Sequence, residues 1–166
     1  MEEDKQQQQS EKQLVVFDLA NEVYGMDIGV VLEIIRMQEI TKVPRTPEFV
    51  EGIINLRGKI IPVVDLRKRF SLPVTDETAD NRIVVVDIDG QGIGMVVDAV
   101  AEVMRINSGS IEPPSEAITT KESDYLLGIA KLDDRLIILL DMNKLLLKEE
   151  RRSLAQADLT PEPATA

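Results

Sequence analysis

The sequence contains an internal repeat, and this repeat restricts the chain to folds with two similar halves. Residues 15–36 align without gaps with residues 84–105, and eight of the 22 positions are identical. Residues 52–70 align in the same way with residues 128–146, where a glycine, an aspartate and a lysine recur. Two blocks in the same order that keep glycines and charges indicate a duplicated structural unit.

Each copy of the repeat has the pattern of a series of short strands. Its apolar residues are mainly Val, Ile and Leu in runs of five to eight residues, separated by Gly, Pro, Asn or Asp. Such runs are typical of β-strands joined by turns, and five of them suffice for a small barrel. We therefore predict an all-β fold of two pseudo-twofold-related five-stranded β-barrels, residues 12–81 and residues 82–150. A few short helices are expected, two of them capped by Asp65 and Asp141.

Both ends of the chain have compositions that do not support a core. Residues 1–11 hold four acidic residues and four consecutive glutamines, and residues 151–166 are mostly small or polar and contain prolines. We expect disordered tails at both ends. The longest apolar runs are far shorter than the ~20 residues that span a bilayer. The prediction is therefore a single soluble, cytoplasmic domain over residues 12–150.

The composition excludes several classes of site. The chain contains no Cys and no His, so it can form neither a disulfide nor a Cys/His zinc site, and it lacks a thiol nucleophile and an imidazole base. A net charge of −11 disfavours nucleic-acid binding, because that binding depends on cations. We expect no cofactor, no metal ion and no nucleic-acid partner. Only carboxylate chemistry stays open to an enzyme.

A hydrolase with a carboxylate pair is a remote alternative. Asp65 and Asp141 occupy equivalent positions of the repeat, like the paired carboxylates of aspartic proteases. Their surroundings, VVDLR and LLDMN, lack the Asp-Thr/Ser-Gly sequence of those enzymes, and helix capping explains both residues. An enzyme of this kind requires the two carboxyl groups to converge in an open cleft. We predict that the chain is not an enzyme.

Two further motifs have structural explanations. GQGIG at residues 90–94 does not precede a helix, so it is predicted to be a hairpin turn and a strand rather than a nucleotide-binding loop. Arg67, Lys68 and Arg69 form a basic run on a short helix, where a solvated face is the expected environment. Neither motif indicates a ligand.

The segment NLRG, residues 55–58, is the most specific short motif. It lies between two apolar runs, so it is predicted to be a tight strand connection that exposes the guanidinium of Arg57. The second copy has KLDD there and lacks both the Arg and the Gly, which indicates a separate task for the first copy. The alternative is that Arg57 only closes a hairpin and pairs with an acid. Because Glu33 lies in the same half, we expect the two charges to lie within about 8 Å of each other.

These motifs resemble the CheW family of bacterial chemotaxis coupling proteins over about residues 12–150. The resemblance is carried by the runs VVFDLANEVYGMDIGVVLEI, GIINLRGKIIPVVDLR, GMVVDAVAEVMR and YLLGIAKLDDRLIILLDMNKLL. It implies two intertwined SH3-like barrels with a hydrophobic core between them and no catalysis. It also implies an adaptor between the cytoplasmic tip of methyl-accepting chemoreceptors and the histidine kinase CheA, whose regulatory domain is built like CheW.

The resemblance further implies two binding faces. The kinase-binding residues, carried over by position, are Glu33, Gly52, Asn55, Leu56, Arg57 and Gly58. The receptor-binding residues, at the seam between the barrels, are Val15, Ile28, Val31 and Val100, and plain core is the alternative for each of these apolar positions.

The resemblance also sets expectations about location and assembly. The protein is expected to be a monomer when free, and to be recruited to membrane receptor arrays without inserting into the membrane. An adaptor of a non-flagellar chemosensory array, controlling pili or development, is an alternative that the residues do not separate from this one.

Overall fold

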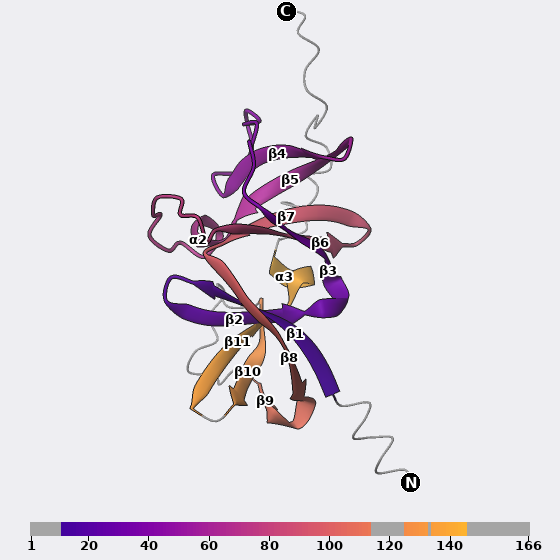
Figure 1. Cartoon of the computed structure of the whole chain (residues 1–166), viewed down its shortest axis with the longest axis vertical. Helices are drawn as coiled ribbons and strands as arrows, with labels where there is room; N and C mark the ends of the chain where they lie inside the picture. Colours follow the sequence, from indigo (N-terminus) through magenta and orange to yellow (C-terminus); the bar gives the residue numbers. More distant parts are fainter. Residues whose placement is uncertain (1–10, 114–124, 133, 146–166) are drawn as a thin grey trace, which may run out of the picture.

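The structure is a computed structural model that describes residues 11–113, 125–132 and 134–145, most of them in strands (Figure 1). The strands are β1 (Glu11–Leu19), β2 (Glu22–Asp27), β3 (Val31–Arg36), β4 (Val50–Leu56), β5 (Lys59–Asp65), β6 (Arg82–Ile88), β7 (Gln91–Val97), β8 (Ala99–Asn107), β9 (Ile111–Glu112), β10 (Leu126–Leu132) and β11 (Arg135–Leu140). The short helices are η1 (Ile28–Val30), α2 (Leu66–Arg69), η2 (Ser108–Ser110) and α3 (Met142–Leu145).

The expected tails lie outside the described residues, except that Glu11 already begins β1. None of the helices in the described part of the chain is long and apolar enough to cross a membrane.

The strands form two sheets with the same order. One sheet runs β8-β1-β2-β11-β10-β9, and the other runs β3-β6-β7-β5-β4. The repeat makes β6 and β7 the counterparts of β1 and β2, and it matches β3, β4 and β5 with β8, β10 and β11. The two sheets therefore correspond strand by strand, which confirms the all-β fold of two related SH3-like barrels. The six-stranded sheet differs only by the two-residue strand β9.

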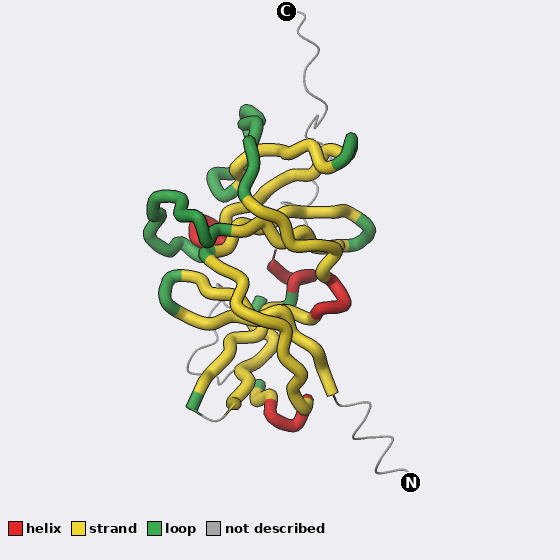
Figure 2. Tube along the Cα trace, in the orientation of Figure 1, coloured by secondary structure: helices red, strands yellow, loops and turns green. Residues whose placement is uncertain are grey.

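Each sheet takes strands from both copies of the repeat. The chain crosses between the sheets after Asp27 and returns after Val97, and Figure 2 shows the two groups of strands joined by these crossings. The five-stranded sheet is therefore built from the continuous segment 31–97. The expected division at residues 81 and 82 does not separate the two sheets. Strand β3 instead pairs in antiparallel fashion with β6 of the other copy, within the same sheet.

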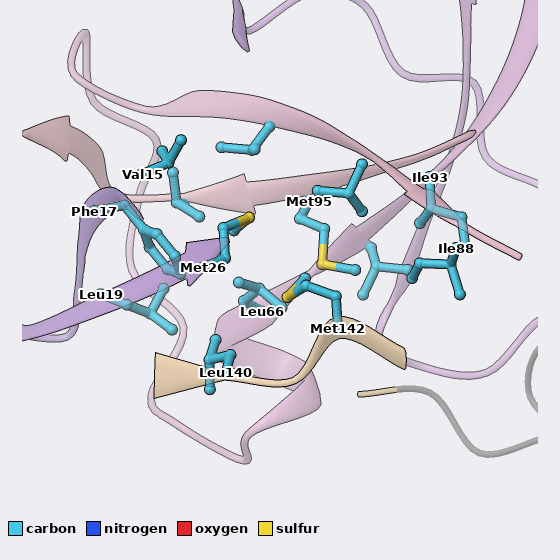
Figure 3. Packing of buried hydrophobic residues seen from close by; sticks show 14 residues of the cluster. Val15, Phe17, Leu19, Met26, Leu66, Ile88, Ile93, Met95, Leu140 and Met142 are labelled. Atoms are coloured by element: carbon cyan, nitrogen blue, oxygen red, sulfur yellow. The ribbon is translucent and has the colours of Figure 1, made fainter. Parts of the chain in front are cut away.

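The apolar runs fill three cores because the central strands are buried on both faces. In β1, Leu14 and Val16 point into the six-stranded barrel, whereas Val15, Phe17 and Leu19 point into the layer between the sheets. The same alternation occurs in β6. Figure 3 shows the layer between the sheets, where side chains from both barrels meet. A strand buried on both faces has no polar side, which explains the consecutive valines in the sequence.

Two equivalent glycines close the barrels. Thr41 exchanges two backbone hydrogen bonds with Ile53, of 2.9 and 2.8 Å, and Glu112 of β9 pairs with Ile129 in the other barrel. A Cβ on Gly52 would lie 2.1 Å from the carbonyl oxygen of Thr41, and one on Gly128 would lie 2.7 Å from that of Glu112. Gly52 also has φ +145. Both glycines therefore make room for the backbone that crosses the barrel edge.

A partly buried ion pair joins the two halves at the second crossing. Asp98 lies between β7 and β8, and it accepts hydrogen bonds from Arg67 Nε at Oδ1 (2.8 Å) and from the Ala20 backbone N–H at Oδ2 (2.8 Å). Arg67 belongs to α2 beside the five-stranded sheet, and Ala20 belongs to the β1–β2 turn of the other sheet. Asp98 thereby connects both halves through one carboxylate.

The basic run on α2 is not a solvated face, so that expectation is wrong. The Arg67 side chain is only 15% exposed, because it is paired with Asp98. The ammonium of Lys68 lies 2.7 Å from the carboxylate of Glu51. Burial by itself raises the pKa of Asp98, but the hydrogen bonds from Arg67 and Ala20 outweigh burial, so the pKa lies below its ordinary value.

Gly52→Ala should destabilise the protein by about 3 kcal/mol, because it adds a backbone clash to a conformation that suits glycine. Gly92→Ala is the matched control, since a Cβ there would lie at least 3.9 Å from its neighbours. Urea unfolding of both variants measures the difference. Equal stability of the two variants would contradict the role given to Gly52.

Asp98→Asn should lower the free energy of unfolding by about 2 kcal/mol at neutral pH. Because the folded-state pKa of Asp98 is lowered, its stabilisation is present above the unfolded pKa and is lost as the pH falls through the folded pKa. The gap between wild type and variant should therefore narrow below about pH 4. Urea unfolding at a series of pH values tests this, and a gap that stays constant with pH would refute it.

Candidate functional site

The NLRG segment forms the turn of the β4–β5 hairpin. Leu56 pairs with Lys59, which leaves Arg57 and Gly58 as the two turn residues, with φ of 52 and 85. Positive φ at both positions is the mark of a type I′ turn, which matches the twist of paired strands. The side chain of Asn55 accepts a hydrogen bond of 2.7 Å from the Gly58 backbone N–H. The predicted tight connection is therefore confirmed.

Arg57 and Glu33 form a bidentate ion pair across the barrel end. Arg57 Nη1 donates a hydrogen bond of 3.2 Å to Glu33 Oε1, and Nη2 donates to Glu33 Oε2. The prediction that these charges lie close together is confirmed. Arg57 remains 72% exposed, whereas Glu33 is 28% exposed. The hydrogen bond from Arg57 lowers the pKa of Glu33, and the pair fixes the turn relative to β3.

Beside this ion pair lies a shallow pocket of about 320 Å³ at the end of the five-stranded barrel. It is lined by Leu32, Glu33, Leu56, Arg57, Lys59, Ile61, Val85 and Gly92. Its walls are aliphatic, and its charged groups are Glu33, Arg57 and Lys59. Leu32 is 58% exposed, and it is the bulged residue of β3 between the pairs Val31–Val86 and Glu33–Val85. An exposed apolar hollow with a charged border can accept a side chain from another protein.

The structure brings most of the expected kinase-binding residues together. Glu33, Leu56 and Arg57 line the pocket, and Asn55 and Gly58 shape its turn. Gly52 is buried at the barrel edge, where Thr41 already explains the glycine.

Sequence reasoning missed five lining residues. These are Leu32, Lys59, Ile61, Val85 and Gly92. Lys59 directly follows the NLRG turn and Ile61 lies two residues further along β5, so their nearness to the motif in the sequence could have identified them. Leu32 and Gly92 could not be found in this way, because they come from strands brought together by the exchange between the copies.

The expected receptor-binding residues divide into core and surface. Val15 is 1% exposed in the layer between the sheets, so it is a core residue and cannot form a contact surface. The reason is that β1 lies between β8 and β2 and is covered on both faces. Val31 and Val100 are half-buried against the same core. Ile28 in η1 is 36% exposed at the first crossing.

Comparison with known proteins identifies the family of this chain. The family model for the CheW-like domain matches residues 13–150. The chain belongs to the CheW family. It is 36% identical over 139 residues to the chemotaxis protein CheW of Klebsiella aerogenes, covering 84% of each chain. It is 35% identical over 147 residues to that of Treponema pallidum, covering 86% of each chain.

A solved CheW structure has the same fold. The crystal structure of the scaffolding protein TtCheW from Thermoanaerobacter tengcongensis aligns with a TM-score of 0.78 and 50% sequence identity. The alignment covers 84% of this chain and 94% of that chain. CheW proteins are scaffold adaptors of chemotaxis rather than enzymes, and so is this chain.

The two aspartates of the carboxylate alternative cap helices in this CheW domain. Asp65 Oδ1 accepts a hydrogen bond of 2.8 Å from the Arg67 backbone N–H, and Asp141 Oδ1 accepts one of 3.0 Å from Asn143. Burial raises the pKa of Asp65. The two caps follow β5 and β11, which lie in different sheets. Their equivalence in the repeat is therefore explained by capping.

The second CheW barrel has an ion pair like that of Arg57 and Glu33. Arg135 Nη1 donates a hydrogen bond of 3.4 Å to Glu102, which is the repeat counterpart of Glu33. Arg135 is the counterpart of Lys59, two positions beyond that of Arg57. The KLDD segment has lost the arginine of the turn, but the next strand supplies another one.

Arg57→Ala should leave the fold intact, because the side chain is exposed and its partner is close to solvent. Arg67→Ala is the contrasting variant, since that guanidinium is mostly shielded from solvent and pairs with Asp98, which connects both halves. Circular dichroism and thermal unfolding should show a wild-type transition for the first variant and a lower midpoint for the second. An unfolded Arg57→Ala protein would show that Arg57 has a structural role instead.

Proposed function

We propose that this protein couples methyl-accepting chemoreceptors to the histidine kinase CheA in chemotaxis signalling, without catalysing a reaction. The observation that carries the proposal is the exposed Arg57–Glu33 pair beside an apolar pocket, at the barrel end of a CheW-family chain. An ion pair this exposed adds little to folding, so its fixed geometry favours a role in binding.

The end of the five-stranded barrel is the proposed kinase-binding face. It presents Glu33, Asn55, Leu56, Arg57 and Gly58, and the ion pair holds the turn against β3. The CheA regulatory domain, built like CheW, would offer an equivalent barrel end. Apolar contact in the pocket would supply affinity, and the charges at its border would set the orientation of the partner.

The junction between the barrels is the proposed receptor-binding face. Val31 and Val100 lie beside the crossings, where they are partly exposed and pack against the core between the sheets. Ile28 lies at the first crossing, close to Val31 in the chain, and is exposed. A helical receptor tip could place apolar side chains against such a surface. Val15 has no part in this face, because it is covered by the sheets.

The charge distribution supports two different partners. Residues 31–97, which form the five-stranded half, carry ten acidic and nine basic residues. The described residues of the other half, 11–30, 98–113, 125–132 and 134–145, carry nine acidic and five basic residues. Among the described residues, one half is thus nearly neutral and the other is more acidic, and unequal potentials favour different binding surfaces. We propose a cytoplasmic protein, monomeric when free, that is recruited to receptor arrays at the membrane.

Variants that each lose only one interaction, with CheA or with the receptors, would test this proposal. Arg57→Ala should reduce binding of purified CheA at least tenfold and keep binding to receptor-containing membranes, because it disturbs only the barrel end. Ile28→Asp should do the reverse, because it places a charge on the apolar junction. Co-sedimentation with receptor membranes, with and without CheA, measures both interactions.

Wild type should bring CheA to the membranes, and neither variant should do so. Circular dichroism of both variants is the control for folding. A wild-type protein that binds neither receptor membranes nor CheA would overturn the proposed function, and loss of both interactions in either folded variant would overturn the assignment of two separate faces.

A further inference from the structure

Gly92 is a glycine that the backbone does not require. Its φ lies outside the left-handed region, and a Cβ there would lie 3.9 Å from Ile61 Cδ1 and Leu32 Cδ1. These distances are ordinary van der Waals contacts. At Gly94, two residues further along β7, a Cβ would come within 2.8 Å of Ile83 Cγ2. Gly94 therefore relieves a clash, whereas Gly92 leaves space unfilled at the pocket.

The repeat provides an internal comparison for this position. The counterpart of Gly92 is Val23 in β2, which is half-buried and packs against the interior cluster of the six-stranded barrel. Two other wall positions keep large aliphatic residues in both copies, because Ile61 corresponds to Ile137 and Val85 to Val16, whereas Leu32 corresponds to Ala101. In one barrel a valine side chain of the chain itself fills this position, and in the other barrel the position is open.

We propose that Gly92 keeps the barrel-end pocket open for one aliphatic side chain of a protein partner, and that the size of residue 92 limits which side chain enters. The walls formed by Leu32, Ile61 and Val85 favour a side chain such as Leu, Ile or Met. The border carries two cations, Arg57 and Lys59, against the single anion Glu33. The entering residue therefore has an acidic neighbour on the partner.

This inference rests on the proposed function, because it takes the CheA regulatory domain as the partner that supplies the side chain. In the other barrel, the side chain of Val23 occupies the equivalent position. The two barrel ends therefore differ. At one end a side chain of the chain itself fills the space, and at the other end a side chain of the partner fills it.

Calorimetric titration of the full chain with purified CheA regulatory domain tests the inference. Gly92→Val should lower affinity roughly 10- to 100-fold, the loss expected when one aliphatic side chain is no longer buried, and Gly92→Ala should lower it less. Gln91→Val, on the adjacent residue of β7, is the matched control for added apolar volume and should bind as wild type. Gly92→Val should also unfold at the same or a higher midpoint, because it fills an open space.

Each other outcome has a distinct meaning. Wild-type affinity in a folded Gly92→Val chain, together with weak binding by Arg57→Ala, would overturn the pocket inference and leave the proposed function standing. A lower unfolding midpoint for Gly92→Val would overturn the claim that this space is open. Absence of binding by wild type would overturn the proposed function, and the inference with it.

Discussion

The central strands β1 and β6 each contribute side chains to two cores, and the remaining elements are arranged around them. In β1, Val16 belongs to a barrel interior and Phe17 to the layer between the sheets, and in β6 Val85 and Val86 divide in the same way. A barrel separated from its partner would expose the whole inter-sheet layer to water. Because units of this size bury too little apolar surface on their own, each barrel depends on the other for stability.

The repeat was enough to predict the fold class, because equivalent strands were recognisable from their valines, glycines and charges. The NLRG turn and the Arg57–Glu33 pair were also predictable, since turn chemistry and charge are local properties. The pattern of residues by itself did not predict the exchange of strands between the copies, although the family resemblance implied intertwined barrels. Sequence similarity shows that two segments have the same conformation, but it does not show which of the two copies provides the neighbouring strand.

The errors in individual residues have related causes. Val15 was expected at a contact surface, but a strand buried on both faces gives no alternation from which an exposed side could be recognised. Arg67 was expected in solvent because its neighbours are basic, whereas its partner Asp98 is 31 positions away. Residues whose environment is created by distant segments are outside the reach of local pattern reasoning. The same limit hid Leu32 and Gly92 from the predicted site.

The exchange of the β1–β2 and β6–β7 hairpins between the copies has a consequence for how such a molecule can be assembled. A chain with a single copy of the repeat could complete its sheet only by giving its first hairpin to a second molecule and receiving the equivalent hairpin in return. That arrangement is a domain-swapped homodimer, with the same two barrels and the same core between them. The present fold is thus a swapped dimer whose two subunits have been joined by the segment between α2 and β6. Joining them makes the effective concentration of the second subunit independent of the concentration of protein, and it allows the two halves to diverge.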